Sequence, residues 1–485
     1  MNTAQARSGG FRSLVRSAVI WRSGSQIVGQ IITWAATFLV LRILSPSDYG
    51  LYAMAAAVLA LLALLNGYGL ANALVQRENV SRQDLRQLFG MLLVVNAGLA
   101  AIQIAAAPAV ASYYGEPAVT DILRVLSLVF LSNPFLALGY CILAREMDFR
   151  RQAQVNLATA LLGAVVALGG AVAGLGVWTL VLAPLAMFIS RGLAMAAVAR
   201  AFMWPSFDFR GTWAMAGYGG TVALSSIFYF AQTQSDVVIA GRVFDAHTVG
   251  LYTTSLFLAQ IFVNKVVPPL NEVTFSALAR MQDDPAAFAS GFLLSVRVIM
   301  LLSIPFCFGL AVTAQPLVQV VLGEKWLGVA PILQIIGFAI PWMTLQVLFA
   351  PATNAAGRPA IAMKNSVAGA IVMPAALLVG VRWGIEGMAL AWLAAYPAIT
   401  VFSAAMSAGA IGVTVRQIGG AVAPSALAGA AMALAVTVAD RHFAGESPVE
   451  RLAVLVAFGG AVYLAVMLAI ARPRLTELIS LVRNR

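Results

Sequence analysis

The chain has 485 residues, of which 61% are hydrophobic and only 10% are charged, whereas an average soluble domain is about 45–50% apolar and about 25% charged. A soluble protein of this size has no interior large enough to hide so much apolar surface, which excludes a soluble globular fold. The formal net charge of +11 does not indicate nucleic-acid binding, because the basic residues gather at the ends of apolar runs, as in the loops of membrane proteins.

The apolar runs are typical of membrane helices. Residues 157–173 and 421–438, for example, are continuous and rich in Ala, Leu and Val, whereas transmembrane strands alternate apolar and polar residues. We therefore predict an all-α polytopic membrane protein. Residues 1–17 contain three arginines and no short apolar core with a small-residue cleavage site, so we expect no cleaved signal peptide. An amphipathic surface helix fits residues 11–20.

A membrane span needs roughly 20 apolar residues, and the chain contains about fourteen such helices in succession. They begin near residues 22, 51, 87, 122, 154, 177, 215, 249, 292, 329, 362, 385, 418 and 450. With the N-terminus in the cytoplasm, 22 Lys and Arg residues fall in cytoplasmic segments, 7 fall on the opposite side, and Lys265 lies inside a helix. This asymmetry predicts that both termini are cytoplasmic.

An internal repeat indicates two halves. RILSPSDYGLY at residues 42–52 and RVFDAHTVGLY at residues 242–252 share an arginine and Gly-Leu-Tyr at a spacing of 200. Two shorter matches follow at similar spacings: Ile122-Leu123 with Ile332-Leu333, and Gly176-Val177 with Gly384-Ile385. We therefore predict two parallel six-helix repeats plus two C-terminal helices, with a site between the halves near the midplane. The predicted segments are residues 1–21 (cytoplasmic N-terminal segment), 22–210 (first bundle), 211–416 (second bundle), 417–472 (two further helices) and 473–485 (cytoplasmic tail).

Four ionisable residues in or at the ends of the spans are candidate site residues, because a charge deep in lipid costs roughly 2.5–3.5 kcal/mol and usually faces a cavity or a partner. Arg42 and Arg242 end the first and seventh helices, Asp236 lies inside the seventh, and Lys265 lies inside the eighth. One interpretation is a water-filled cavity for an anionic substrate, with Asp236 as a proton or sodium site. The other is that the arginines extend to the headgroups and that Lys265 and Asp236 form a structural pair.

Other polar and conformational features leave alternatives open. Gln26, Gln30 and Gln103 either line the same cavity or form hydrogen bonds between helices. Pro268 and Pro269 either bend the eighth helix or mark its cytoplasmic end.

The sequence contains no pattern typical of an enzyme. It has no phosphate-binding glycine loop with lysine, no HExxH and no GxSxG motif, so we predict neither an enzyme nor a cofactor or metal site. Cys141 and Cys307 lie in apolar stretches and are expected to be small core residues.

Several motifs in order carry a resemblance that runs from about residue 20 to 410. They are residues 41–52, 68–70 and 73–76; LAREMDFR at 143–150 and GLGVWTLV at 174–181; residues 236–252; and FSALARMQDD at 275–284. This pattern resembles bacterial polysaccharide exporters of the Wzx type, in the superfamily shared with MATE drug exporters and MurJ-like lipid flippases, and a subgroup that includes the colanic acid exporter. Gly67 and Ser276 depart from it, since the family often has Asp and Pro there.

The resemblance implies flipping of an undecaprenyl-diphosphate-linked oligosaccharide across the cytoplasmic membrane by alternating access, for exopolysaccharide, capsule or O-antigen synthesis. Arg42, Arg242 and Lys265 would then bind the diphosphate, and Asp236 would couple an ion. The expected partners are this substrate, membrane lipids and, in addition, a polysaccharide polymerase or export machinery. The alternatives are an ion-coupled MATE-like drug exporter and a lipid II flippase.

Overall fold

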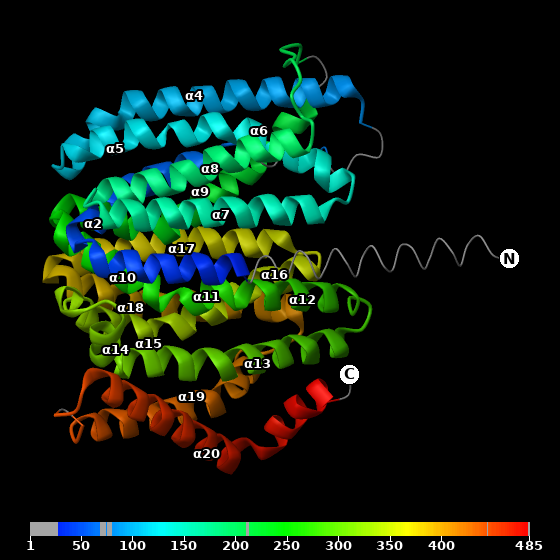
Figure 1. Ribbon diagram of the computed structural model, residues 1–485. Helices are drawn as coiled ribbons and strands as arrows, with labels where there is room; N and C mark the ends of the chain where they lie inside the picture. Colours follow the sequence, from blue (N-terminus) through cyan, green and yellow to red (C-terminus); the bar gives the residue numbers. More distant parts are fainter. Residues whose placement is uncertain (1–27, 68–73, 75–79, 210–212, 444, 484–485) are drawn as a thin grey trace. The chain divides into compact units, whose positions relative to one another are not determined.

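The computed structural model describes residues 28–67, 74, 80–209, 213–443 and 445–483 (Figure 1). The predicted N-terminal segment 1–21, its surface helix over residues 11–20, Gln26 and most of the motif at residues 68–76 lie outside the described residues. Every regular element among the described residues is a helix. The prediction of an all-α polytopic membrane fold is confirmed, while the count of fourteen helices stays a prediction.

The chain divides into two compact units. The first comprises Met1–Ile227 with Asp245–His247, and the second comprises Phe228–Phe244 with Thr248–Arg485. The described helices of the first unit are the helix Val28–Ile43, α2 Pro46–Ala63, α4 Arg82–Tyr114, α5 Ala118–Leu126, α6 Leu128–Arg145, α7 Phe149–Val172 and α8 Val177–Val198. Helix α9, Trp213–Val243, begins in the first unit and ends in the second.

The second unit repeats the order of long and short helices. It contains α10 Ala246–Ala259, α11 Ile261–Lys265, α12 Val267–Ala279, α13 Pro285–Val312, α14 Ala314–Val321, α15 Val329–Val347, α16 Phe349–Ala355, α17 Pro359–Gly380, α18 Gly384–Ile411, α19 Val415–Asp440 and α20 Pro448–Arg483. A long helix, a short helix, a long helix and a hairpin thus occur as α4 to α8 and again as α13 to α18, where the short helix α16 is added before the hairpin. Helix α20 bends at Ala471, where the backbone leaves the helical region.

Local sequence explains where many helices begin and end. Capping boxes at Ser45, Ser81 and Thr414 open α2, α4 and α19, because each side chain bonds the third helical N–H and receives the reciprocal bond. Glycine in the left-handed conformation ends α4 at Gly115 (φ 74°) and α18 at Gly412 (φ 78°). Of the thirteen predicted starts within the described residues, those at 177 and 329 coincide with the observed ones, and the largest offset is seven residues, at Pro285.

The surface fits a lipid environment. Within the described residues, ten helical segments are long and apolar enough to cross a membrane, and one of them, Pro359–Ile411, contains both α17 and α18. Large apolar side chains are exposed along these helices, for example Val172 at 78% and Leu434 at 69%. Both cysteines are free and buried, as predicted.

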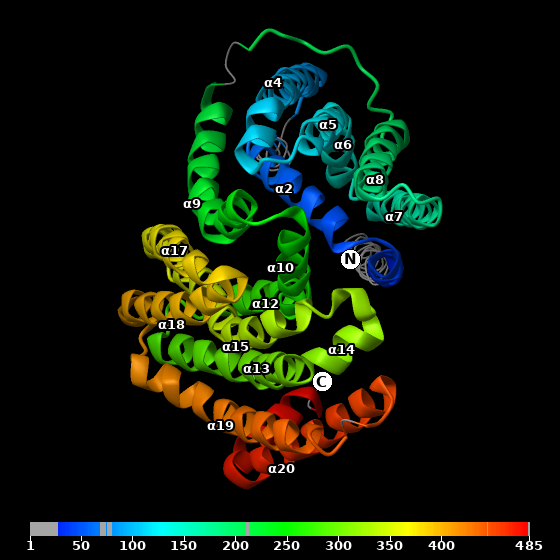
Figure 2. The same cartoon turned by 90° about the vertical axis from the view of Figure 1, so that its left-hand side faces the viewer.

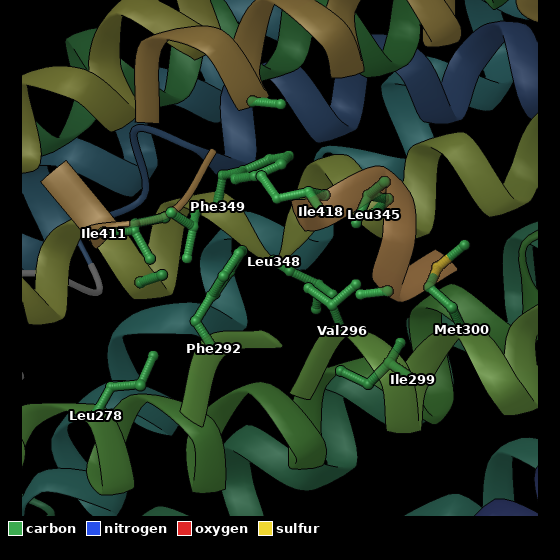
Figure 3. Close-up of a cluster of buried hydrophobic side chains, with 14 of the residues drawn as sticks. Leu278, Phe292, Val296, Ile299, Met300, Leu345, Leu348, Phe349, Ile411 and Ile418 are labelled. Atoms are coloured by element: carbon green, nitrogen blue, oxygen red, sulfur yellow. The ribbon is translucent and has the colours of Figure 1, made fainter. Parts of the chain in front are cut away.

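A hydrophobic core of the second unit joins α11, α12, α13, α15, α16, α18 and α19 (Figure 3). The rings of Phe292 and Phe349 lie at its centre with centroids 5.9 Å apart, and Val296 and Leu348 are buried beside them. Burying each such side chain contributes about 1.5–3 kcal/mol relative to water. This core includes residues of α11 and α12, the two helices that carry the exposed polar residues described below.

Glycines allow the two helices of a hairpin to approach each other closely in both units. In α17 and α18, the carbonyl of Gly387 lies where a Cβ on Gly380 would stand, and the carbonyl of Gly380 lies where a Cβ on Gly387 would stand. In α7 and α8, which lie side by side in Figure 2, a Cβ on Gly163 would lie 3.1 Å from Cβ of Met187. The two helices of each hairpin are therefore in closest contact at glycine.

Candidate functional site

The two arginines of the internal repeat occupy the same place in the local structure. The helix that contains Arg42 ends one residue later, at Ile43, and α2 begins four residues later, at Pro46. Arg242 likewise precedes the end of α9 at Val243 by one residue and the start of α10 at Ala246 by four. Both side chains are exposed, and each takes part in a polar or charged interaction.

Lys265 lies where the eighth predicted helix is broken. Helix α11 ends at Lys265, the N–H of Val266 donates to the Phe262 carbonyl at 2.8 Å, and α12 begins at Val267 with Pro268 in its first turn. Proline at the start of a helix is tolerated because the first N–H groups have no intrahelical partner, whereas inside a helix it breaks a hydrogen bond. The prolines therefore break this helix, and it continues beyond them to Ala279.

Exposed polar side chains lie on both sides of this break, and we call them the polar face: Asn264 and Lys265 on α11, and Glu272 and Ser276 on α12. Val273 and Phe275 of α12 are exposed as well. Glu272 lies in the second turn of α12, seven residues after Lys265 and beyond the break. Glu272 was not among the sequence-predicted residues, although a second ionisable residue so close to Lys265 in sequence is a signal that could have identified it. This face presents a cation, a carboxylate and neutral polar groups.

Asp236 has the opposite environment. Its side chain is only 2% exposed, and its Oδ1 accepts a hydrogen bond from the backbone N–H of Val237 at 2.7 Å. It lies within electrostatic range of the Tyr252 and Tyr396 hydroxyls, from α10 and α18. A carboxyl group removed from water in this way is costly unless neighbouring groups compensate or it binds a proton.

Aromatic and amide side chains complete the surroundings of Asp236, which we call the Asp236 cluster: Gln232, Asp236, Tyr252, Trp392 and Tyr396. Nε1 of Trp392 donates to the Tyr252 hydroxyl at 2.8 Å, and the Trp392 and Tyr396 rings lie 5.0 Å apart. Gln232, one helical turn before Asp236, is buried against Gly369 of α17 so closely that a Cβ on that glycine would overlap its side chain. All of these residues belong to the second unit.

The structure thus assigns the predicted residues to different settings. Arg42 belongs to the first unit, and Asp236, Arg242 and Lys265 belong to the second. Lys265 is exposed at a helix break, and Asp236 is buried among aromatic rings. Gln103 forms the hydrogen bond between helices that was one of its two interpretations, because its Nε2 donates to the Leu123 carbonyl of α5 at 2.7 Å. Binding and coupling roles for the four charged residues stay predictions.

Comparison with known proteins identifies the family. A family described as polysaccharide biosynthesis protein matches residues 39–331, which is more than half of the chain. The chain belongs to this family. The succinoglycan biosynthesis transport protein ExoT of Rhizobium meliloti is 26% identical over 453 residues, which cover 92% of this chain and 90% of that protein. The lipopolysaccharide biosynthesis protein WzxC of Escherichia coli is 24% identical over 301 residues, covering 61% and 60% of the two chains.

Solved structures identify the fold of this polysaccharide biosynthesis protein. The lipid II flippase MurJ in an inward closed conformation has a TM-score of 0.74 at 11% identity, covering 94% of this chain and 99% of that one. A multidrug resistance MATE family transporter in an inward-facing conformation has a TM-score of 0.63 at 14% identity, covering 81% and 98%. The predicted resemblance to polysaccharide exporters of this superfamily is confirmed.

Proposed function

We propose that this protein moves an undecaprenyl-diphosphate-linked oligosaccharide from the inner to the outer leaflet of the bacterial cytoplasmic membrane by alternating access. Its membership of the polysaccharide biosynthesis family and its similarity to the transport protein ExoT support a role in polysaccharide export. The fold similarity to MurJ and MATE transporters supports a mechanism in which a membrane protein changes the side to which its substrate site opens.

The observation that carries this proposal is the exposed polar face on α11 and α12. A membrane helix that exposes Asn264, Lys265 and Glu272 is unfavourable against lipid tails and favourable against a hydrated passage. Such a passage suits a substrate with a charged diphosphate and a polar sugar chain. In this proposal Lys265, together with Arg42 and Arg242, binds the diphosphate, because cations form strong charge-assisted hydrogen bonds to phosphate oxygens.

Coupling to an ion is assigned to Asp236. A buried carboxyl group surrounded by tyrosine hydroxyls changes its interactions when it gains or loses a proton or a sodium ion. In this proposal ion binding at the Asp236 cluster biases the second unit between two conformations, and the ion gradient thereby drives export.

The proposed setting is the inner membrane with both termini in the cytoplasm, where the lipid-linked substrate is made. A polysaccharide polymerase or export machinery would then receive the substrate on the outer side. Reporter fusions at either terminus test the orientation, and activity of a reporter that works only outside the cytoplasm would contradict it.

The decisive experiment replaces Lys265 with alanine. In a strain that depends on this protein for surface polysaccharide, we expect Lys265→Ala to lower polymer output at least about tenfold, since a hydrogen bond to a charged group contributes about 1.5–3 kcal/mol. Lys364→Ala is the matched control, because Lys364 is also an exposed lysine of the second unit but lies in the first turns of α17. Immunoblots of membrane fractions check that both variants reach the membrane.

Lys265→Arg retains the positive charge and should restore much of the output. Normal output from Lys265→Ala at normal membrane levels would contradict the assignment. The drug-exporter alternative predicts instead that the protein lowers cellular accumulation of cationic drugs and that polymer output does not depend on it.

A further inference from the structure

A groove lies along the α7–α8 hairpin of the first unit, near the start of α7 and the end of α8. It has a volume of about 380 Å³ and is lined by Arg151, Gln154, Val155, Ala158, Thr159, Ala194 and Val198. Val155 and Met195, both buried, form part of a hydrophobic cluster beneath it. The groove is therefore apolar along its base and has a cation among its lining residues.

A second arginine is held beside this groove. Nε of Arg191 donates to Oγ1 of Thr159 at 3.2 Å, and the Thr159 hydroxyl in turn donates to the Val155 carbonyl at 2.8 Å. The Arg191 guanidinium also lies over the Phe188 ring, 5.9 Å from its centroid. These contacts orient the Arg191 guanidinium next to a residue that lines the groove.

The position of Arg191 along α8 indicates how deep its guanidinium group lies in the membrane. It lies seven residues before the end of α8 at Val198, which corresponds to about 10 Å along the helix. Large apolar residues of the same hairpin are exposed nearby, with Leu162 at 42%, Val165 at 59% and Leu193 at 49%. Because α8 has 22 residues and the hydrocarbon core of a membrane is about 30 Å thick, Arg191 lies inside the hydrocarbon level, where a guanidinium group is favourable only beside polar groups or a phosphate that it reaches.

The charge of the groove favours an anion. Arg151 is about half exposed and forms an ion pair with Asp148, 3.3 Å between Nε and Oδ2. Among the described residues that line the groove, Arg151 is the one that carries a charge, and Arg191 beside them adds a second guanidinium group. A zwitterionic headgroup would bring its own ammonium group towards these arginines, whereas an anionic phosphate diester would not.

A second groove of the same hairpin fits an acyl chain. It has a volume of about 510 Å³ and is lined by Val166, Leu182, Leu185, Ala186, Ile189, Ser190 and Leu193. The one polar side chain among these residues, Ser190, donates to the Met187 carbonyl at 3.1 Å. The hairpin therefore offers a cationic region for a headgroup and an apolar groove for a hydrocarbon chain.

We propose that the α7–α8 hairpin binds an anionic phospholipid, with its phosphate in the groove that Arg151 lines and Arg191 borders, and an acyl chain along the apolar groove. The bound lipid is a resident of the surrounding membrane rather than the transported substrate. This inference does not depend on the proposed transport function, because binding is measured without transport.

Native mass spectrometry of the purified full-length protein tests the proposal. The protein is supplied with equal amounts of phosphatidylglycerol and phosphatidylethanolamine, and the lipid that stays bound is counted. We expect phosphatidylglycerol to be retained selectively, and its apparent affinity to fall about fivefold for each arginine lost in Arg151→Gln and Arg191→Gln. Arg150→Gln is the matched control, because Arg150 precedes Arg151 in α7 and does not line the groove.

A second variant keeps the test independent of the arginines. Ala158 is exposed and lines the groove, so Ala158→Leu fills space there without changing a charge and should also weaken phosphatidylglycerol binding. Three results would overturn the proposal: equal retention of the two lipids, unchanged retention in Arg151→Gln and Ala158→Leu, and displacement of phosphatidylglycerol by an equal amount of a polyprenyl diphosphate. The last result would assign the groove to the transported class of lipid.

Discussion

The two units bury polar groups of different chemistry in similar frameworks of helices. In the first unit, the fully buried Asn96 of α4 donates to the carbonyls of Asn66 and Leu92 at 3.0 and 2.9 Å, and Asn133 of α6 donates to Asn96 at 3.3 Å. The second unit also buries a neutral amide, Asn365, which donates to the Ser407 hydroxyl at 3.2 Å, but in addition it buries a carboxyl group, Asp236, near two tyrosine hydroxyls.

We interpret the buried amides of the first unit as groups that stabilise the fold, and the buried Asp236 carboxyl group as one that acts in transport. Neutral amides that bond to carbonyls tie helices together at modest cost, because their hydrogen bonds replace those to water. A carboxylate in the same position is much more expensive to bury and changes charge when it binds an ion. We therefore expect substitutions in the first unit's amide network to act on stability, and substitutions in the Asp236 cluster to act on transport.

The largest expected effect is that of Asp236→Asn. Asparagine has nearly the same shape and can still accept the hydrogen bond from the Val237 N–H, but it cannot carry a proton or a negative charge. If Asp236 couples an ion, polymer output should fall about tenfold or more, within the range of typical coupling free energies. Output is measured in the polysaccharide-dependent strain, and thermal unfolding of the purified protein should be unchanged or shifted to higher temperature.

Asp121→Asn is the matched control for this substitution. Asp121 lies in α5 of the first unit, is mostly exposed and pairs with Arg124 at 3.6 Å, so its loss should leave output and stability nearly unchanged. If the Asp236→Asn variant gave wild-type polymer output, the Asp236 carboxylate would not be needed for transport. The buried polar groups of the two units would then not differ in function.

Asn96→Leu should have an intermediate effect of the other kind. It leaves the Asn66 carbonyl and the Asn133 amide each without one partner, so we expect the free energy of unfolding to fall by about 1–3 kcal/mol. Denaturant unfolding in detergent micelles measures this change, and output per molecule of membrane-inserted protein should stay close to wild type. Loss of output at unchanged stability would mean that the first unit's amides also take part in transport.

Gln103→Leu should have the smallest effect. Within the described residues, Oε1 of Gln103 is buried without a hydrogen-bond partner, so leucine removes an unfavourable group together with the favourable bond to Leu123. The Leu123 carbonyl still accepts from the Ser127 N–H at 3.0 Å. We expect a change in unfolding free energy within about 1 kcal/mol, and a larger loss would show that this contact holds α4 to α5 more strongly than its geometry indicates.

The fold could be predicted from the sequence to a considerable extent, because each span must satisfy its own backbone and therefore appears as one apolar run. The starts at Val177 and Val329 were predicted to the residue. Of the breaks within spans, the one at Pro268 and Pro269 was one of two predicted alternatives, whereas α5 and α6 were predicted as one helix and α14 was not predicted. A continuous apolar run gives no signal for a change of direction that is set by packing against other helices.

The candidate site was only partly predictable. Lys265 and Asp236 stand out because ionisable residues are rare in apolar runs, and Glu272 could have been found from its closeness to Lys265 in sequence. Trp392 and Tyr396, however, lie more than 150 residues from Asp236 and resemble ordinary membrane aromatics in sequence. Only the packing of α9, α10 and α18 in the second unit brings them to the carboxyl group.

The glycine contacts within the hairpins have a mechanical consequence. Where Gly380 and Gly387 meet backbone to backbone, neither helix can slide along the other without a collision, and so α17 and α18 should travel together as one stiff pair. Any conformational change must then bend the chain elsewhere. In the second unit, the break between α11 and α12 is the least costly place for the chain to flex, because Pro268 and Pro269 have no N–H group to continue the helical hydrogen bonds.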